Sequence, residues 1–171
     1  MTKIVRLTAA VAALVLSTTP AMAQTAPVKQ ATASAKIVKP LTLTWVQDLD
    51  LGTILLSGAS AWTGATVGVS RAGVFSCTNS NVTCSGATKV AKYKVTGTNN
   101  QVVTINAGSV TMTNQNDNTK TLVMTVDSPG TVNLSNSGNV GLEFALGGSI
   151  SVASTTADGV YLGTFNVTVN Y

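Results

Sequence analysis

The sequence predicts an antiparallel all-β fold, and we favour a β-sandwich. Hydrophobic and polar residues alternate along several short stretches, which is the period of a half-buried strand. Turn signals rich in Gly, Asn, Asp, Ser and Pro recur about every eight to twelve residues, as in sandwiches and barrels. Only 9% of the residues are charged. Thr, Ser, Asn, Gly and Val are common instead, a composition that favours strands and tight turns.

The N-terminus has the features of an export signal. Lys3 and Arg6 precede the apolar run 7–16, and Ala21-Met22-Ala23 forms a small-x-small cleavage site. We therefore expect a signal peptide over residues 1–23 and export to the periplasm, then to the cell surface or beyond it. The run is only about ten residues, whereas a membrane-spanning helix needs about 20. No later segment is longer or more apolar, so we expect no integral membrane segment after signal removal.

The exported chain divides into an extension and one domain. Residues 24–35 are small and polar, and only Val28 is large, which predicts a flexible N-terminal extension. Residues 36–171 have the length of a single domain that can bury a substantial core.

The first strands follow the alternating pattern. Ile37 to Trp45 predicts a strand that bends or changes sheet near Pro40, because proline within a strand indicates an edge or a break. A short strand over 48–54 and a loop over 57–65 follow. Further strands are expected around 67–69, 73–75, 89–96, 101–105, 110–113, 119–126, 132–134, 140–146 and 150–152. In the segment 89–96 the pattern places Ala91, Tyr93 and Val95 inward and Lys92, Lys94 and Thr96 in water.

The last predicted strand, residues 159–171, is the most regular. One side of it carries Tyr161, Gly163, Phe165, Val167, Val169 and Tyr171. The other side is mostly polar. We expect the first side to face the core, with Tyr171 as a core-facing aromatic and the C-terminus built into the sheet.

The two cysteines, Cys77 and Cys84, are close in sequence, and the predicted compartment is oxidising. A local disulfide is the favoured interpretation. A metal pair is the alternative, but the chain has no His and no second cysteine pair. A loop this short predicts a disulfide that fixes a hairpin tip and does not hold the fold together.

Catalytic chemistry has little support. With no His and six carboxylates, the nearest acidic pair is Asp48 and Asp50, which could act as acid and base or bind a cation. We favour a strand whose acids face solvent while Leu49 and Leu51 face inward. Residues 114–118 hint at a calcium loop, but a polar turn is favoured because the EF-hand glycine and glutamate are missing. We therefore predict no enzyme activity, no cofactor and no catalytic or metal site.

The sequence offers few signals of a binding surface. The basic residues are scattered, which argues against a nucleic-acid surface. A sugar-stacking platform could be formed by the aromatic residues Trp45, Trp62, Tyr93, Phe144 and Tyr161, although core packing explains most of them equally well. Trp62, within a Gly/Ser/Ala loop, is the aromatic residue that we expect to be exposed and the candidate ligand contact.

Three segments, residues 35–44, 48–54 and 159–171, resemble in that order the bacterial secreted family called domain of unknown function 4402. The closing Gly-x-Tyr-x-Gly-Thr-Phe-x-Val-Thr-Val-x-Tyr pattern is similar to the C-terminal strand of spore-coat-U-type and other chaperone-usher pilin subunits. The resemblance implies an immunoglobulin-like, pilin-like sandwich that lacks one strand. A periplasmic chaperone first completes it, and the N-terminal extension of another subunit then replaces the chaperone. The common disulfide of those subunits starts in the first strand, whereas the cysteines here are local.

Two functions follow as expectations. The first is a structural surface protein, a pilin-like subunit of a fimbria or extracellular matrix. It would be assembled by strand addition to residues 161–171, with the segment 24–35 as donor. Its partners would be copies of itself or related subunits, together with a chaperone and an usher. The alternative is a self-contained secreted carbohydrate-binding module with Trp62 in its site.

Overall fold

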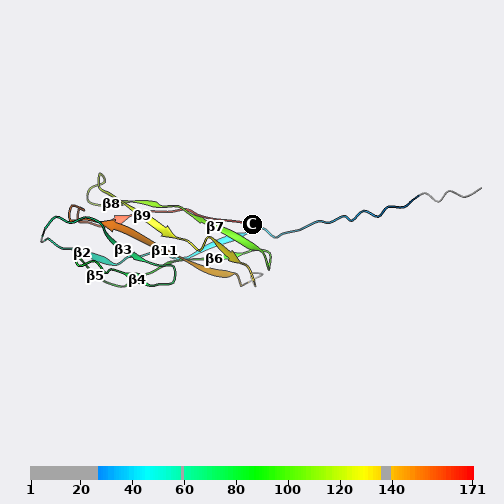
Figure 1. Cartoon of the computed structure of the whole chain (residues 1–171), viewed down its shortest axis with the longest axis horizontal. Helices are drawn as coiled ribbons and strands as arrows, with labels where there is room; N and C mark the ends of the chain where they lie inside the picture. The colour runs from blue at the N-terminus through cyan, green and yellow to red at the C-terminus, as the bar shows by residue number, and fades with distance from the viewer. Residues whose placement is uncertain (1–26, 59, 136–139) are drawn as a thin grey trace, which may run out of the picture. The chain divides into compact units, whose positions relative to one another are not determined.

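A computed structural model describes residues 27–58, 60–135 and 140–171. The predicted signal peptide and residues 24–26 of the predicted extension lie outside these ranges. The chain divides into two units at Ala35. In the first unit, residues 27–35 are exposed and belong to no strand. Residues 36–171 form the second, compact unit, which contains every strand of the described residues (Figure 1).

The second unit consists of short strands joined by turns, and the described residues contain no helix. Every strand pair is antiparallel. The predicted all-β, antiparallel class is therefore confirmed. The strands are β1 (Thr42–Gln47), β2 (Thr53–Leu56), β3 (Ala65–Val69), β4 (Phe75–Ser76), β5 (Val82–Ser85), β6 (Ala91–Thr96), β7 (Val102–Ala107), β8 (Val110–Asn114), β9 (Thr121–Asp127), β10 (Thr131–Asn133), β11 (Leu142–Val152), β12 (Tyr161–Leu162) and β13 (Val167–Asn170).

A curled eight-stranded sheet is organised around β11. The sheet has the order β1-β6-β11-β9-β8-β12, and β3 pairs with both β11 and β4. The first half of β11 pairs with β6, and its second half pairs with β3 and β9. One long strand thus connects the two ends of the unit (Figure 1).

Two small sheets pack against this large sheet and create two apolar clusters. Strands β2 and β5 form one small sheet, whose Ile54, Leu56 and Val82 pack with Val67 and Ile150 in the first cluster. Strands β10, β7 and β13 form the other small sheet. Its inward side chains pack with those of β6 and of the first half of β11 in the second cluster.

The alternation predicted for residues 89–96 is confirmed on β6. Ala91 and Val95 are buried, whereas Lys94 is exposed. The lysines therefore lie on the outer face of the large sheet. There Lys92 forms an ion pair with Glu143 of β11 at 3.2 Å.

The prediction of separate strands over 140–146 and 150–152 is wrong, because β11 continues through Gly147 and Gly148. A Cβ at Gly147 would lie 2.3 Å from the carbonyl oxygen of Val69, and one at Gly148 would lie 2.9 Å from the sulfur of Met124. The two glycines let neighbouring chain segments approach β11 closely. They are packing positions within a strand, and the sequence pattern suggested a break between strands.

The first predicted strands are also shorter than expected. The chain over 36–41 belongs to no strand, and β1 begins after Pro40, at Thr42. Residues 48–52 contribute only an isolated bridge between Asp50 and Lys89 before β2 begins at Thr53. Pro40 accounts for part of the difference, since proline cannot donate a backbone hydrogen bond.

Candidate functional site

The last predicted strand is divided between two sheets. Tyr161 and Leu162 form β12 and pair with β8 of the large sheet. Residues 163–166 belong to no strand, and β13 then pairs with β7 of the small sheet. The expectation of one regular strand over 159–171 is therefore wrong. The same alternating pattern instead serves two strands in two different sheets.

Gly163 and Phe165 account for this change of sheet. A Cβ at Gly163 would lie 2.8 Å from Val110 Cγ1 and 2.9 Å from the carbonyl oxygen of Thr111, so the chain passes closely over β8. Phe165 is half-buried and packs against both apolar clusters. The phenyl ring thus fills the space between the two halves of the core while the backbone crosses from one sheet to the other.

The other residues of the predicted face differ in burial. Tyr161, Val167 and Val169 are half-buried, and Val167 and Val169 pack against the second cluster. Tyr161 donates a hydrogen bond from its hydroxyl to the carbonyl oxygen of Ala157 at 2.8 Å. The expected inward alternation is thus present on β13, although neither valine is fully buried.

Tyr171 is not a core residue, which corrects the expectation that the chain ends on a core-facing aromatic. The residue is 46% exposed. Its hydroxyl donates to the carbonyl oxygen of Lys39 at 2.5 Å and accepts from the amide of Thr98 at 2.8 Å. Gly97 permits this approach, because a Cβ there would lie 2.6 Å from the hydroxyl oxygen. Tyr171 therefore fastens the C-terminal end to the segment that leads into β1.

Strands β1 and β13 each lie at the edge of a sheet. In the sheet order of the described residues, β1 pairs only with β6 and β13 pairs only with β7, so each has one unpaired edge. Pro40 precedes β1, and a register irregularity interrupts it between Trp45 and Gln47. Prolines and bulges are the devices by which proteins protect edges from strand addition. Strand β13, Val167–Asn170, contains no proline or charged residue, and its pairing with β7 is regular.

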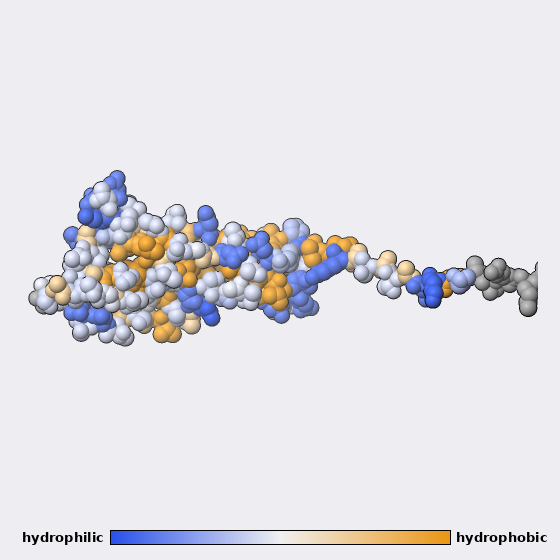
Figure 2. Space-filling model, turned by 45° about the horizontal axis from the view of Figure 1, so that its top comes forward, coloured by the Kyte–Doolittle hydropathy of each residue, from blue (hydrophilic) through white to orange (hydrophobic). Residues whose placement is uncertain are grey.

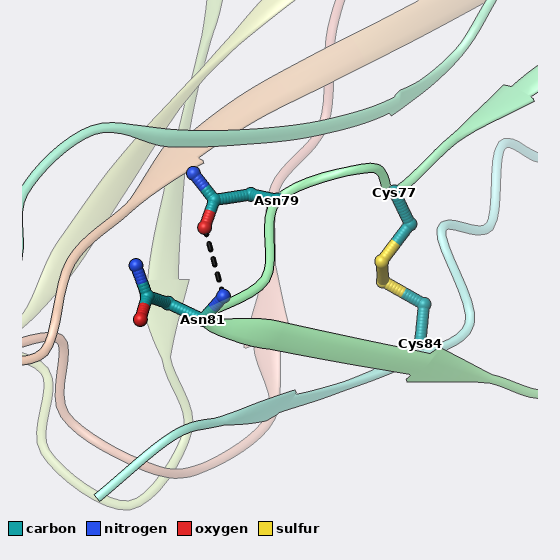
Figure 3. The surroundings of a disulfide bond; sticks show 4 residues. All are labelled: Cys77, Asn79, Asn81 and Cys84. Carbon is teal, nitrogen blue, oxygen red and sulfur yellow. Dashed lines mark hydrogen bonds between the residues drawn. A yellow bond between two sulfur atoms is a disulfide. The ribbon is translucent and has the colours of Figure 1, made fainter. Parts of the chain in front are cut away.

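The predicted disulfide between Cys77 and Cys84 is present, with the two Cα atoms 6.3 Å apart (Figure 3). Its predicted role at a hairpin tip is wrong. Cys77 follows β4, which pairs with β3 of the large sheet, whereas Cys84 lies on β5, which pairs with β2. The bond thus connects the large sheet to a small one, and both cysteines pack against the first cluster. Within the loop, the side-chain oxygen of Asn79 accepts from the amide of Asn81 at 2.9 Å.

The expectation that Trp62 is exposed is wrong, because the residue is half-buried and packs against the first cluster. Its indole N–H donates to the carbonyl oxygen of Ser57, and its backbone bonds to Ser154, all at 3.2 Å. The more exposed tryptophan is Trp45, at 58%. The alternating pattern did not predict this exposure, because it places Trp45 on the same side of the strand as the inward-facing Leu41 and Leu43. The one indication in the sequence was Pro40, since a proline suggests that a strand lies at the edge of a sheet.

The two aspartates considered for catalysis have separate structural roles. Both are exposed. Asp48 accepts from the indole N–H of Trp45 at 2.9 Å, whereas Asp50 accepts from the amide of Gly52 at 2.8 Å. The expected inward position of their neighbours is confirmed for Leu51, which is buried. Among the described residues, no group of three or more Asp, Glu, Cys or His side chains could hold a metal ion.

The polar segment 114–118 is a turn closed by its own side chains. Asn114 is almost completely buried, its side-chain oxygen accepts from the amides of Asn116 and Asp117, and its NH₂ group donates to the carbonyl oxygen of Asp158 at 2.7 Å. Hydrogen bonds from the side chain and backbone of Thr119 lower the pKa of Asp117. These bonds hold the loop beside the start of β12, so Asn114 has a structural role that the calcium-loop comparison did not suggest.

Comparison with known proteins places the chain in a family. No helix among the described residues is long and apolar enough to cross a membrane. No curated protein and no solved structure matches the chain. One family model, described as Domain of unknown function (DUF4402), matches residues 41–171. This range extends from the residue before β1 to the last residue and so includes every strand described above. The chain belongs to this DUF4402 family.

Proposed function

We propose that this chain is an exported structural surface protein, a pilin-like subunit of a fimbria or extracellular matrix that assembles by strand addition. In this proposal the unit is an immunoglobulin-like sandwich that lacks one strand. The observation that carries the proposal is the unpaired, regular and uncharged edge of β13. Unpaired N–H and C=O groups along such an edge are a template for an additional strand.

The acceptor has suitable apolar surroundings. Val167 and Val169 on β13 and Phe165 before it are all half-buried, so they would lose further water contact if another strand lay beside them. Thr168 and Asn170 face the other way and are exposed. The C-terminal pattern thus offers an incompletely covered apolar face next to a free hydrogen-bonding edge.

The proposed donor is the N-terminal segment of another copy. Residues 27–35 belong to no strand and are exposed. In the sequence, Ala31, Ala33 and Ala35 alternate with Thr32 and Ser34, which gives an extended strand one small apolar face. This segment would pair with the main chain of β13 and place small side chains against a shallow surface. A periplasmic chaperone and an usher would hold and deliver the subunit before this exchange.

Deleting residues 24–35 tests the proposal. We expect the deletion to abolish polymers, as seen by electron microscopy, while the thermal midpoint of the folded unit stays unchanged. Unchanged assembly of the deleted chain would refute the proposal.

A matched pair of variants tests which face of the N-terminal donor segment contacts the acceptor. Ala33→Asp with Ala35→Asp puts two charges on the apolar face, and Thr32→Asp with Ser34→Asp puts the same two charges on the opposite face. We expect assembly to fail only in the alanine variant. Equal effects of the two pairs would mean that the segment does not dock as a strand.

A further inference from the structure

Three aromatic residues form a row across the large sheet. Trp45 on β1 pairs with Tyr93 on β6, and Tyr93 pairs with Phe144 on β11. Directly paired residues project from the same face of a sheet. The rings of Tyr93 and Phe144 are stacked, with centroids 5.9 Å apart and planes inclined at 19°. Exposure rises along the row from the buried Phe144 through the half-buried Tyr93 to Trp45, which is 58% exposed.

The exposed indole is held in place by a carboxylate. The indole N–H of Trp45 donates to Oδ1 of Asp48 at 2.9 Å. Asp48 is itself exposed, so its carboxylate can also accept hydrogen bonds from a molecule in solution. The same carboxylate affects Tyr93, whose pKa is raised by burial and then by the negative charge of Asp48. A tyrosine hydroxyl carries its proton at neutral pH even without this shift, so the Tyr93 hydroxyl can act as a hydrogen-bond donor.

We propose that Trp45 and Asp48 form a binding site for a neutral pyranose sugar of a polysaccharide, with the Tyr93 hydroxyl at its inner side. The apolar face of a pyranose ring would stack on the indole. Its hydroxyl groups would donate to the carboxylate of Asp48. A fixed aromatic surface with a few polar groups that set the orientation is the usual composition of small-molecule sites. The site is independent of the assembly proposed above, because it lies on β1, on Asp48 directly after β1 and on β6, and uses neither β13 nor the N-terminal segment.

The charge around the row favours a neutral ligand. Asp48 would repel an acidic sugar. The next residues on β6, Lys92 and Lys94, alternate with Tyr93 and so project from the opposite face. Lys92 is also paired with Glu143 there. Apolar side chains reach the surface of the folded unit in several patches (Figure 2), but the residues of this row combine such exposure with a fixed carboxylate.

The chain has only two tryptophans, which allows a direct test. In the Trp62→Phe variant, Trp45 is the only indole. We expect its fluorescence to change on titration with neutral glucan, mannan or galactan oligosaccharides and to stay constant with polygalacturonate. In the Trp45→Phe variant, Trp62 should report no change with any of these sugars. A response that survives only in the Trp45→Phe variant would overturn the proposal and place the ligand at Trp62.

Calorimetry on the unmodified chain keeps the test independent of the folding of either variant. Trp45→Ala should weaken binding of the responding oligosaccharide at least about tenfold, equivalent to about 1.4 kcal/mol. Asp48→Asn retains an acceptor for the indole and removes the charge, so it should reduce the discrimination against polygalacturonate. The absence of heat with every neutral oligosaccharide would refute the proposal, as would equal affinity in the Trp45→Ala chain.

Discussion

The C-terminal residues give the sharpest prediction, because the structure shows which interactions they make. Truncating the chain after Thr168 removes Val169, Asn170 and Tyr171. The half-buried Val169 contributes about 1 kcal/mol, taken as half of the value for complete burial. The two hydrogen bonds of the Tyr171 hydroxyl contribute about 1 kcal/mol each, and the exposure of this residue keeps the value from being larger.

The expected loss is therefore about 3 kcal/mol, against a total stability of roughly 5 to 15 kcal/mol for a domain. At roughly 2 to 4 °C per kcal/mol, the thermal midpoint should fall by about 10 °C. Less folded protein should also accumulate in the periplasm. Thermal unfolding measures the first effect, and the yield of soluble periplasmic protein measures the second.

Two variants separate the contributions. Tyr171→Phe keeps the ring and removes the hydroxyl, so it should cost about 1 to 2 kcal/mol. Asn166→Ser with Asn170→Ser changes exposed side chains on the other side and should have little effect. A truncated chain as stable and as abundant as the full-length chain would refute the reasoning, as would a larger loss in the asparagine variant.

The remaining predictions concern the disulfide, one glycine and one carboxylate. Replacing both cysteines by alanine should lower the free energy of unfolding by roughly 2 to 3 kcal/mol, measured by urea unfolding, and an unchanged value would contradict the role of the bond between sheets. Gly68→Ala places a Cβ 2.6 Å from Ser149 Cβ and should lower the free energy of unfolding by about 2 to 3 kcal/mol. The control Gly108→Ala has nothing within 4 Å of the new Cβ and should be tolerated. Similar unfolding midpoints for the two variants would contradict the close approach at Gly68. Thr119→Val removes the largest cause of the lowered pKa of Asp117, so that pKa should rise in a carboxyl NMR titration. The stabilisation of the turn by this carboxylate is present above its ordinary pKa and is lost as pH falls through the lowered pKa. This dependence should be weaker in the variant, which keeps the backbone hydrogen bond of residue 119 and the charge of Lys120.

The alternating pattern was sufficient to predict strands and the direction in which their side chains face. Ala91 and Val95 were placed inward and Lys94 outward, and β6 has this arrangement. The pairing of the cysteines also followed from the sequence, because two cysteines with a short spacing leave one possible intramolecular disulfide. These features depend on local periodicity and spacing, which are properties of the chain itself.

The partners of the strands could not be predicted, because a period of two gives the face of a side chain but not its neighbouring strand. The residues 159–171 show one unbroken alternation, yet β12 pairs with β8 and β13 pairs with β7. The change of sheet depends on the packing of Phe165 against both clusters and on the close approach at Gly163. Both are contacts with residues far away in the sequence.

Contacts between distant segments also decided which candidate site residues are exposed. The local sequence signals of Trp45 and Trp62 pointed the opposite way from the structure: β1 lies at the edge of a sheet and leaves Trp45 exposed, while the loop of Trp62 folds onto the first cluster. The sequence likewise predicted the disulfide but not that β4 and β5 belong to different sheets. Sequence periodicity determined which side chains of each strand face inward. Only the tertiary packing decided which strands bring them there and which edges and rings stay open to a partner, because burial and pairing are set by contacts between distant segments.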